Sequence, residues 1–328
     1  MAMKYLIGID GGGTNSRLLA VDTKGQVLGR RRGRSTNPES NKHQTVLRRL
    51  QELVAGFLQA SGCRAEDCLA LCVGTAGVDT QASLEAIEAL VAQIDLPCPK
   101  VVVNDAQIAL YANTRGGPGL LLNAGTGSIA YGINGQHQAG RVGGYGYLIG
   151  DEASAYWVAS EGIRRALHAH DGVGADTMLV SLLQEELNLR SIVDVFDYVH
   201  AHNKADIARL SPLVTRAQAA GDQVAANILN EASAYLLQCV QALLTRLQMK
   251  PEEHTLYITG GLLLNSPWLL NALKEGLHQR CPGLRIQPMT EEAEWGAVYQ
   301  AAQRAGIALP TAPSVLSKIM CKFPETLI

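Results

Sequence analysis

The chain has 328 residues, of which 47% are hydrophobic and 18% charged, and its formal net charge is −2. This length predicts about two domains, and the near-neutral charge argues against nucleic acid as the main partner. No apolar run approaches the ~20 residues of a membrane span, and the N-terminus lacks a signal-peptide layout. Seven cysteines without a CxxC motif are typical of reduced thiols, so a cytoplasmic enzyme is expected.

The first predicted element is a β-hairpin over residues 6–22, LIGIDGGGTNSRLLAVD. Gly11, Gly12 and Gly13 have no Cβ, so the backbone of this turn can approach a ligand closely. Consecutive N–H groups in such a turn bind anions. Because Asp10 would repel a phosphate, the pattern favours a phosphate bridged by Mg²⁺. A plain glycine-rich hairpin is the alternative.

A third strand follows at the edge of the predicted sheet, where the arginine run of residues 30–34 is interpreted as a solvated face. The loop of residues 35–38 comes next. Hydrophobic periodicity then predicts alternating helices and strands: a helix over 45–58, a strand over 68–78, a helix over 80–94, a strand over 99–104 and a helix over 106–113. Four glycine or proline residues within 115–119 mark a boundary between domains of residues 1–117 and 118–328.

A second glycine hairpin opens the second half of the chain, over residues 119–135, GLLLNAGTGSIAYGING. Its apolar strand again runs into a glycine turn, here Gly125-Thr126-Gly127, and Asn134-Gly135 is a strong hairpin signal at its far end. Self-similarity at long spacing indicates an internal duplication. One hairpin unit therefore occurs twice, and the plain-hairpin alternative loses most of its weight.

The second half continues with a glycine-dense stretch over residues 140–150 and a helical insertion over about 152–250. Helical stripes are predicted over 154–167, 176–187, 192–199, 207–219 and 224–247, then a strand over 254–261, a helix over 268–277, a strand over 284–289 and a helix over 291–304. Strands that alternate with helices predict two similar α/β domains, with a ligand cleft between them. Residues 305–328 are expected to form a surface extension.

Several motifs carry a family resemblance along nearly the whole chain. They are GIDGGGT at 8–14, STN at 35–37, NDA at 104–106, AGTGS at 124–128, GGYG at 143–146, GDEASAYW at 150–157 and ITGG at 258–261. Together they resemble the sugar kinase/Hsp70/actin (ASKHA) superfamily, whose members have duplicated ribonuclease H-like ATPase domains. The closer resemblance is to N-acetylglucosamine kinases of the BadF/BadG/BcrA/BcrD ATPase group.

The resemblance implies a role for each matching residue. The ATP phosphates would be bound by Gly12, Gly13, Thr14, Gly125 and Thr126. Gly260 and Gly261 would lie against the adenosine, and Gln218, whose alignment is loose, would face the nucleotide. Asp10 would hold Mg²⁺. The sugar would be lined by Asn37, Asp105, Gly127, Gly144, Tyr145 and Asp151. Many members of the family are dimers, so a homodimer is expected.

Asp105 is the expected catalytic residue, because it ends a buried strand at the carboxyl edge where α/β proteins bind ligands. There it would orient the sugar hydroxyl and accept its proton. The alternative for Asp105, and also for Asp151, is a helix N-cap. Asn37 could likewise only shape a turn. Two departures from better-known animal members concern Tyr145, where they carry Trp, and Ile129, where they carry a polar residue.

The expected function is transfer of the γ-phosphate of ATP to the 6-hydroxyl of N-acetylglucosamine. A kinase for glucosamine or another amino sugar is the main alternative. An ATPase activator of a reductase or dehydratase would need thiolates for an iron–sulfur cluster, and the second hairpin has none. A sugar-responsive repressor is the last alternative, although no helix-turn-helix module precedes residue 4. The expected partner is a small-molecule sugar, with neither nucleic acid nor membrane.

Overall fold

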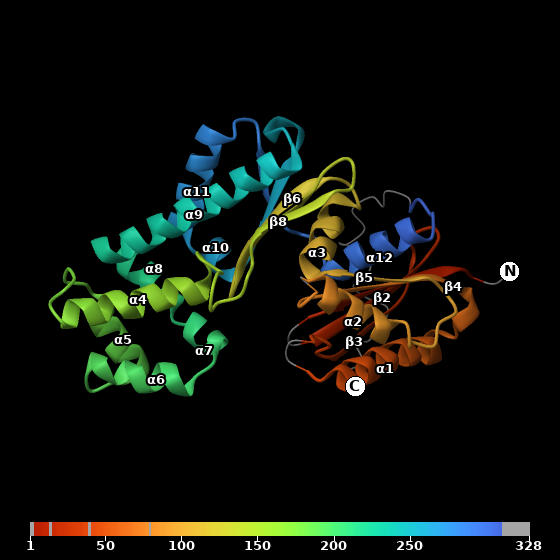
Figure 1. Ribbon diagram of the computed structural model, residues 1–328, viewed down its shortest axis with the longest axis horizontal. Helices are drawn as coiled ribbons and strands as arrows, with labels where there is room; N and C mark the ends of the chain where they lie inside the picture. Colours follow the sequence, from red (N-terminus) through yellow and green to blue (C-terminus); the bar gives the residue numbers. More distant parts are fainter. Residues whose placement is uncertain (1–2, 13–14, 39–40, 79, 310–328) are drawn as a thin grey trace. The chain divides into compact units, whose positions relative to one another are not determined.

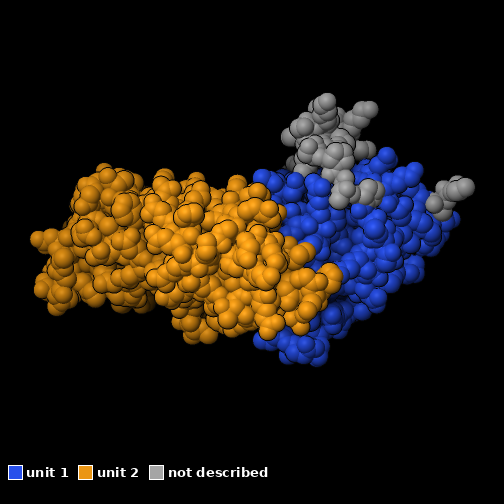
Figure 2. Space-filling view, turned by 90° about the horizontal axis from the view of Figure 1, so that it is seen from above, with its two compact units in different colours: residues 1–117, 290–328 blue, residues 118–289 orange. Residues whose placement is uncertain are grey.

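Two compact units make up the protein (Figure 2). The first contains residues 1–117 and 290–328, and the second contains residues 118–289. The computed structural model describes residues 3–12, 15–38, 41–78 and 80–309. Each unit has one five-stranded sheet and its own helices.

The sheet of the first unit has the strand order β3-β2-β1-β4-β5. Strand β1 pairs antiparallel with β2, β2 antiparallel with β3, and β4 and β5 continue the sheet in parallel. Short turns join the first three strands, whereas helices return the chain to β4 and β5, as parallel pairing requires. The strands are β1 Tyr5–Gly11, β2 Asn15–Asp22, β3 Val27–Arg34, β4 Cys68–Thr75 and β5 Lys100–Asn104.

Two apolar layers cover this sheet because the side chains of β1 alternate between its faces. Tyr5, Ile7 and Ile9 belong to the core that α1 and α2 complete, and Leu6 belongs to the core with α3 and α12. Figure 1 shows these helices around the strands. The helices are α1 His43–Ser61, α2 Gln81–Val91, α3 Asp105–Thr114 and α12 Ala293–Arg304, with a 3₁₀ turn at Ala65–Asp67.

Helix α12 corrects the expected domain boundary, which assigned residues 290–309 to the second half. The helix packs on β1 and α3 and so belongs to the first unit. Two glycines permit this close packing. A Cβ at Gly8 of β1 would lie 2.5 Å from the backbone nitrogen of Val298, and a Cβ at Gly296 would lie 2.7 Å from that of Ala112.

The second unit repeats the topology of the first. Its strand order is β10-β9-β6-β7-β8, in which β6, β7 and β8 are antiparallel and β9 and β10 continue in parallel from β6. The predicted duplication and the α/β fold class are thereby confirmed, while the cleft expected between the halves stays a prediction. The strands are β6 Gly119–Ala124, β7 Ser128–Ile133, β8 Ala139–Gly143, β9 Thr255–Thr259 and β10 Arg285–Pro288.

The predicted helical insertion lies between β8 and β9 and runs through green and cyan in Figure 1. Its longest helix, α9, supplies many residues of the unit's core. The helices are α4 Ala155–His170, α5 Leu179–Leu187, α6 Val195–Ala201, α7 Lys204–Ala208, α8 Ser211–Ala219 and α9 Gln223–Leu247, with 3₁₀ turns at Ile192–Asp194 and Pro251–Glu253. After β9 come α10 Gly261–Asn265, which was not predicted, and α11 Pro267–Arg280. Among the described residues, no helix has the length and apolarity of a membrane span.

Candidate active site

The first glycine turn joins β1 to β2 and is anchored by neighbouring loops. A Cβ at Gly11 would lie 2.9 Å from the Thr36 hydroxyl and 3.0 Å from the Gly74 carbonyl, so only glycine fits there. The Ser35 hydroxyl donates a hydrogen bond of 3.0 Å to the Gly12 carbonyl. Gly13 and Thr14, which were predicted to bind phosphate, lie outside the described residues.

The loop that carries Asn37 is held by a network of side chains. The Ser16 and Thr36 hydroxyls are 2.7 Å apart and buried. The Asn41 amide donates to the Asn37 carbonyl at 2.9 Å, and Arg49 of α1 donates to the Asn41 side chain at 2.7 Å. Asn37 is buried, which suits a fixed polar contact better than a solvated turn. Sequence reasoning gave Arg49 no part in holding this loop.

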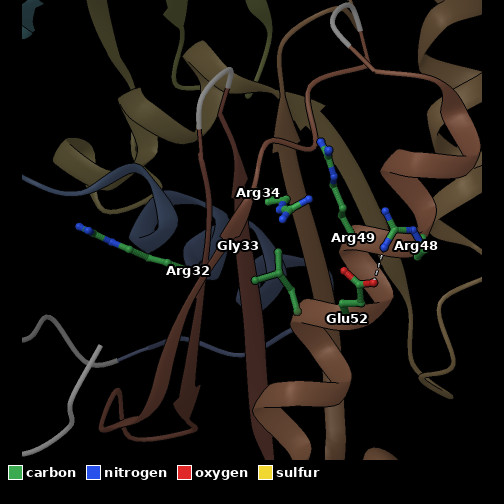
Figure 3. A pocket seen from close by; sticks show the side chains of 7 residues that line it. Arg32, Gly33, Arg34, Arg48, Arg49 and Glu52 are labelled. Carbon is green, nitrogen blue, oxygen red and sulfur yellow. Dashed lines mark hydrogen bonds and ion pairs between the residues drawn. The ribbon is translucent and has the colours of Figure 1, made fainter. Parts of the chain in front are cut away.

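Arginines of β3 and α1 line a hollow of about 250 Å³ beside that network (Figure 3). Arg34, Arg48 and Arg49 lie on one side of β3, whereas Arg32 points away, and Arg48 pairs with Glu52 at 2.7 Å. Strand β3 lies at the edge of the sheet, as predicted. The arginine run is, however, more than a solvated face, because Arg30 forms ion pairs with Glu292 and Glu294.

Asp10 is the penultimate residue of β1 and lies beside a second carboxylate that the sequence did not single out. Its cross-strand partner on β2 is Arg17. Glu294 of α12 is buried, with one oxygen 3.3 Å from Arg30 Nη1 and the other, Oε2, without a hydrogen-bond partner among the described residues. Burial, then the charge of Glu294, raises the pKa of Asp10 from 3.8 to about 6, and Arg17 partly offsets this rise. Burial also raises the pKa of Glu294.

This negative charge, which Arg17 and Arg30 compensate only in part, fits a divalent cation. Mg²⁺ is usually held by one or two carboxylates together with substrate phosphates. Asp10 and the unpartnered Oε2 of Glu294 would supply the protein's share of the charge. In the described part of the chain, no group of three or more His, Cys, Asp or Glu side chains could hold a metal ion by itself. The donor set therefore fits a cation that shares its ligands with a nucleotide.

Replacing Asp10 with asparagine is expected to stabilise the metal-free protein at neutral pH. Because folding raises the pKa of Asp10 from 3.8 to about 6, the folded state binds more protons in this window, and its stability falls as the pH rises through it. Asp10→Asn should raise the free energy of unfolding by about 1–3 kcal/mol at pH 8, and the gain should vanish below pH 4. Urea unfolding with a chelator at several pH values measures this. A gain independent of pH, or one matched by the exposed Asp95→Asn, would contradict it.

Asp105 is the first residue of α3 and follows β5 directly. The helix is capped by Asn104, whose side chain accepts from the Ala106 N–H at 2.8 Å, so the N-cap alternative for Asp105 is wrong. Asp105 is exposed, and its charge contributes to the raised pKa of Asp10. The structure thus brings the predicted base and the predicted metal ligand to one edge of the sheet.

The second glycine turn lies against the end of β9. The Gly125 N–H donates to the Gly127 carbonyl at 2.9 Å, and Thr126 between them is exposed. Gly260 has a φ of 102°, and a Cβ there would overlap the backbone of Ala124. The second glycine turn therefore contacts Gly260 and Gly261. This contact is what the prediction that all of them bind ATP requires. Gln218 is half-buried on α8, which packs on α4, α5 and α9, so its assignment stays a prediction.

The glycine-rich loop after β8 places Asp151 in an unusual backbone conformation. Its φ is 57°, a left-handed value that asparagine and aspartate tolerate best and that is often found at functional sites. Asp151 is buried, and Ser154 caps α4 through the Trp157 N–H, so the N-cap alternative for Asp151 is wrong. A Cβ at Gly127 would lie 2.8 Å from Asp151 Oδ2. The two predicted sugar residues are therefore adjacent.

Lys204 at the start of α7 completes this site, and no sequence signal pointed to it. Its Nζ lies 2.8 Å from Asp151 Oδ2. On the loop itself, Tyr145 is 55% exposed, and the Arg141 guanidinium lies 4.8 Å from its ring centre. Gly144 has a φ of 71° and packs on Ile129, where a Cβ would come within 2.9 Å. Ile129 thus supports the loop instead of offering a polar sugar contact.

A family model matches most of the chain. Residues 7–298 match the model of the BadF/BadG/BcrA/BcrD ATPase family. The chain belongs to this family. The match confirms the resemblance that the motifs predicted, and it covers both glycine turns, Asp10, Asp105 and Asp151.

Other proteins are similar to this BadF/BadG/BcrA/BcrD ATPase over nearly the whole chain. An N-acetylmuramic acid/N-acetylglucosamine kinase of Clostridium acetobutylicum is 34% identical over 90% of this chain and 97% of its own. An N-acetyl-D-glucosamine kinase of Dictyostelium discoideum is 29% identical over 92% of this chain and 98% of its own. The fold is similar to that of a putative N-acetylglucosamine kinase from Chromobacterium violaceum, with a TM-score of 0.71. The two proteins are 24% identical, and the match covers 90% of this chain and 98% of the other.

Proposed function

We propose that this protein transfers the γ-phosphate of ATP to the 6-hydroxyl of N-acetylglucosamine. The chain is an ATP-dependent phosphotransferase with a sugar acceptor, and its relatives are kinases of amino sugars. The finer choice of acceptor and hydroxyl is our proposal. The proposal assigns the phosphates to Gly12, Gly13, Thr14, Gly125 and Thr126, the adenosine to Gly260 and Gly261 with Gln218 facing the nucleotide, and the sugar to Asn37, Asp105, Gly127, Gly144, Tyr145 and Asp151.

One observation carries the proposal. The glycine turn of Gly125 to Gly127 lies directly against the buried carboxylate of Asp151, since a Cβ at Gly127 would be 2.8 Å from Asp151 Oδ2. A glycine turn binds phosphate through its N–H groups, and a buried carboxylate accepts hydrogen bonds from hydroxyls. A phosphate site and a hydroxyl site are therefore neighbours within one unit, as phosphate transfer to a sugar requires.

The proposed reaction needs a proton acceptor and neutralisation of phosphate charge. The sugar oxygen forms a bond to the γ-phosphorus as the bond to the ADP oxygen breaks, and the hydroxyl proton passes to Asp105. An ionised Asp105 on the exposed start of α3 can orient the hydroxyl and accept its proton late in the transfer. Mg²⁺ held by Asp10, with Glu294 nearby, would offset the charge of the phosphates.

A panel of sugars tests the acceptor. We expect ADP release in a coupled assay with N-acetylglucosamine to exceed that with glucosamine, glucose or no sugar by at least about tenfold in kcat/KM, because a site that pairs with an amide group disfavours sugars that leave its polar atoms unpaired. Phosphorus NMR of the product then identifies the esterified hydroxyl. A preference for glucosamine would contradict the proposed acceptor but not the kinase activity. Ester formation at another hydroxyl would contradict only the proposed 6-hydroxyl position.

The proposal includes three further properties. These are a Mg²⁺ requirement, which the position of Asp10 and the family resemblance suggest, a homodimer, which the resemblance alone suggests, and a cytoplasmic location, which the cysteine pattern suggests. The described cysteines are free thiols, which suits a reducing compartment. Light scattering after gel filtration tests the dimer, which would have about twice the chain mass of 35.0 kDa.

A further inference from the structure

Arginines from two elements of the first unit gather around the hollow shown in Figure 3. Arg34 is the last residue of β3, and Arg48 and Arg49 lie near the start of α1. Their side chains lie on the same side of β3, around a volume of about 250 Å³. Charged residues commonly protect an exposed edge strand, but that role does not account for arginines that a helix supplies. We call this feature the arginine hollow.

The three arginines have more donors than the surrounding protein uses. Among the described residues, Arg34 has no hydrogen bond or ion pair, and Nη2 of Arg49 has no hydrogen bond. Arg48 pairs with Glu52 at 2.7 Å, but the two side chains are 61% and 50% exposed, so this pair contributes little. Each guanidinium carries five N–H donors. The arginine hollow can therefore accommodate a ligand that accepts several hydrogen bonds.

Charge and size define the class of that ligand. Three guanidinium groups and one carboxylate, that of Glu52, leave a net charge of +2 in the arginine hollow. A phosphate group carries a charge of about −1.5 to −2 at pH 7, and its oxygens fit the planar fork of a guanidinium. The volume lies just below the roughly 300 Å³ at which pockets for drug-sized ligands begin. The occupant is therefore a small anion.

We infer that the arginine hollow binds phosphate, either free or as the monoester of a small metabolite. Arg34 and Arg48 hold the phosphate oxygens, and Arg49 donates to them from Nη2. This ligand is additional to the ATP of the proposed function. The inference does not depend on which sugar the protein phosphorylates.

Arg49 links the arginine hollow to the loop that carries Asn37. Its Nη1 donates to the Ser35 carbonyl and, at 2.7 Å, to Asn41 Oδ1, and the Asn41 amide donates to the Asn37 carbonyl at 2.9 Å. Without an anion, the guanidinium groups around the hollow repel one another. A bound phosphate removes that repulsion and holds Arg49 where these hydrogen bonds need it. Phosphate should therefore stabilise the loop.

Calorimetric titration tests the site directly. Inorganic phosphate or glycerol 3-phosphate is titrated, at constant ionic strength, into protein saturated with a non-hydrolysable ATP analogue, so that the nucleotide site is filled. We expect one phosphate to bind per chain with a Kd of about 1 mM or tighter. Arg34→Gln should raise this Kd by about tenfold or more, because it removes a charge-assisted hydrogen bond. Tighter binding of glycerol 3-phosphate would identify the ligand as a monoester, and the reverse order would identify it as free phosphate.

Arg304→Gln is the matched control, since it removes an exposed arginine at the end of α12 in the same unit. It should leave the Kd within about twofold. Equal unfolding temperatures of Arg34→Gln and the wild type would show that the fold is kept, as expected for an exposed residue without a partner among the described residues. Absence of saturable binding, loss of binding when the ATP analogue is present, or an unchanged Kd in Arg34→Gln would overturn the inference.

Amide hydrogen exchange measures the effect on the loop. Saturating phosphate should slow exchange of the Thr36 and Asn37 amides by about twofold or more in the wild type, and it should have no effect in Arg34→Gln. Binding of phosphate without slower exchange would contradict the link through Arg49.

Discussion

Asp105→Asn is expected to lower kcat by about 100- to 10,000-fold, the range that a positioned proton acceptor contributes. Asparagine keeps the shape of the side chain and an oxygen that can accept from the Ala106 N–H, as Asp105 Oδ1 does at 2.8 Å. Helix α3 should therefore stay intact, because its cap is Asn104. The dissociation constant of a non-hydrolysable ATP analogue, measured by calorimetry, should change by less than about threefold.

The matched control is Asp95→Asn, which removes an exposed carboxylate from the same unit. It should leave kcat within about twofold, since surface substitutions have small effects. Turnover of Asp105→Asn close to that of the wild type would remove Asp105 from the chemistry. Loss of nucleotide binding together with turnover would instead give Asp105 a part in holding the nucleotide.

Gly296→Ala is expected to destabilise the first unit by about 3 kcal/mol or more, near the upper end for overpacked cores. A Cβ at Gly296 would overlap the Ile108 carbonyl oxygen and lie 2.6 Å from its carbon and 2.7 Å from the Ala112 nitrogen. All three atoms are backbone atoms of α3, so no side-chain rotation relieves the overlap. Helix α12 would have to move away from α3, and Asp105 at the start of α3 would lose its support.

Calorimetric unfolding and amide hydrogen exchange measure this effect. The unfolding transition of the first unit should fall by several degrees, and protection of amides in α3 and α12 should fall with it. Gly56→Ala is the control, because the three atoms nearest to a Cβ there, in the middle of α1, all belong to the side-chain end of Arg31, the first at 2.9 Å, and no backbone atom is among them. That variant should be neutral or stabilised, since alanine is the better helix residue. Equal stability of the two variants would contradict the close packing of α12 on α3.

Local patterns in the sequence predicted most of the elements and the duplication. The turns at Gly11 and Gly125 follow from glycine's conformational freedom, and the helices and strands follow from the spacing of apolar residues. These signals depend on residues close together in the chain, so they can be recognised without any knowledge of packing. The glycine motifs likewise led to the ATPase family, and the family match bears this out.

The fate of three residues was decided by tertiary packing. Glu294 reads as an exposed helical residue, yet α12 buries it beside Asp10. Lys204 stands 53 residues from Asp151 along the chain and reaches it only because α7 packs on α4. From the sequence, Gly296 is a poor helix residue, but the structure shows that the backbone of α3 leaves no room for a Cβ at this position.

The sequence by itself therefore determined the two α/β halves and their glycine turns, and it predicted the carboxylates Asp10, Asp105 and Asp151 as site residues. Only the tertiary structure decided that residues 290–309 pack with the first unit and that a cation neutralises Asp151. The physical reason is that burial and charge pairing join residues distant in the chain, and no local pattern records such a pair.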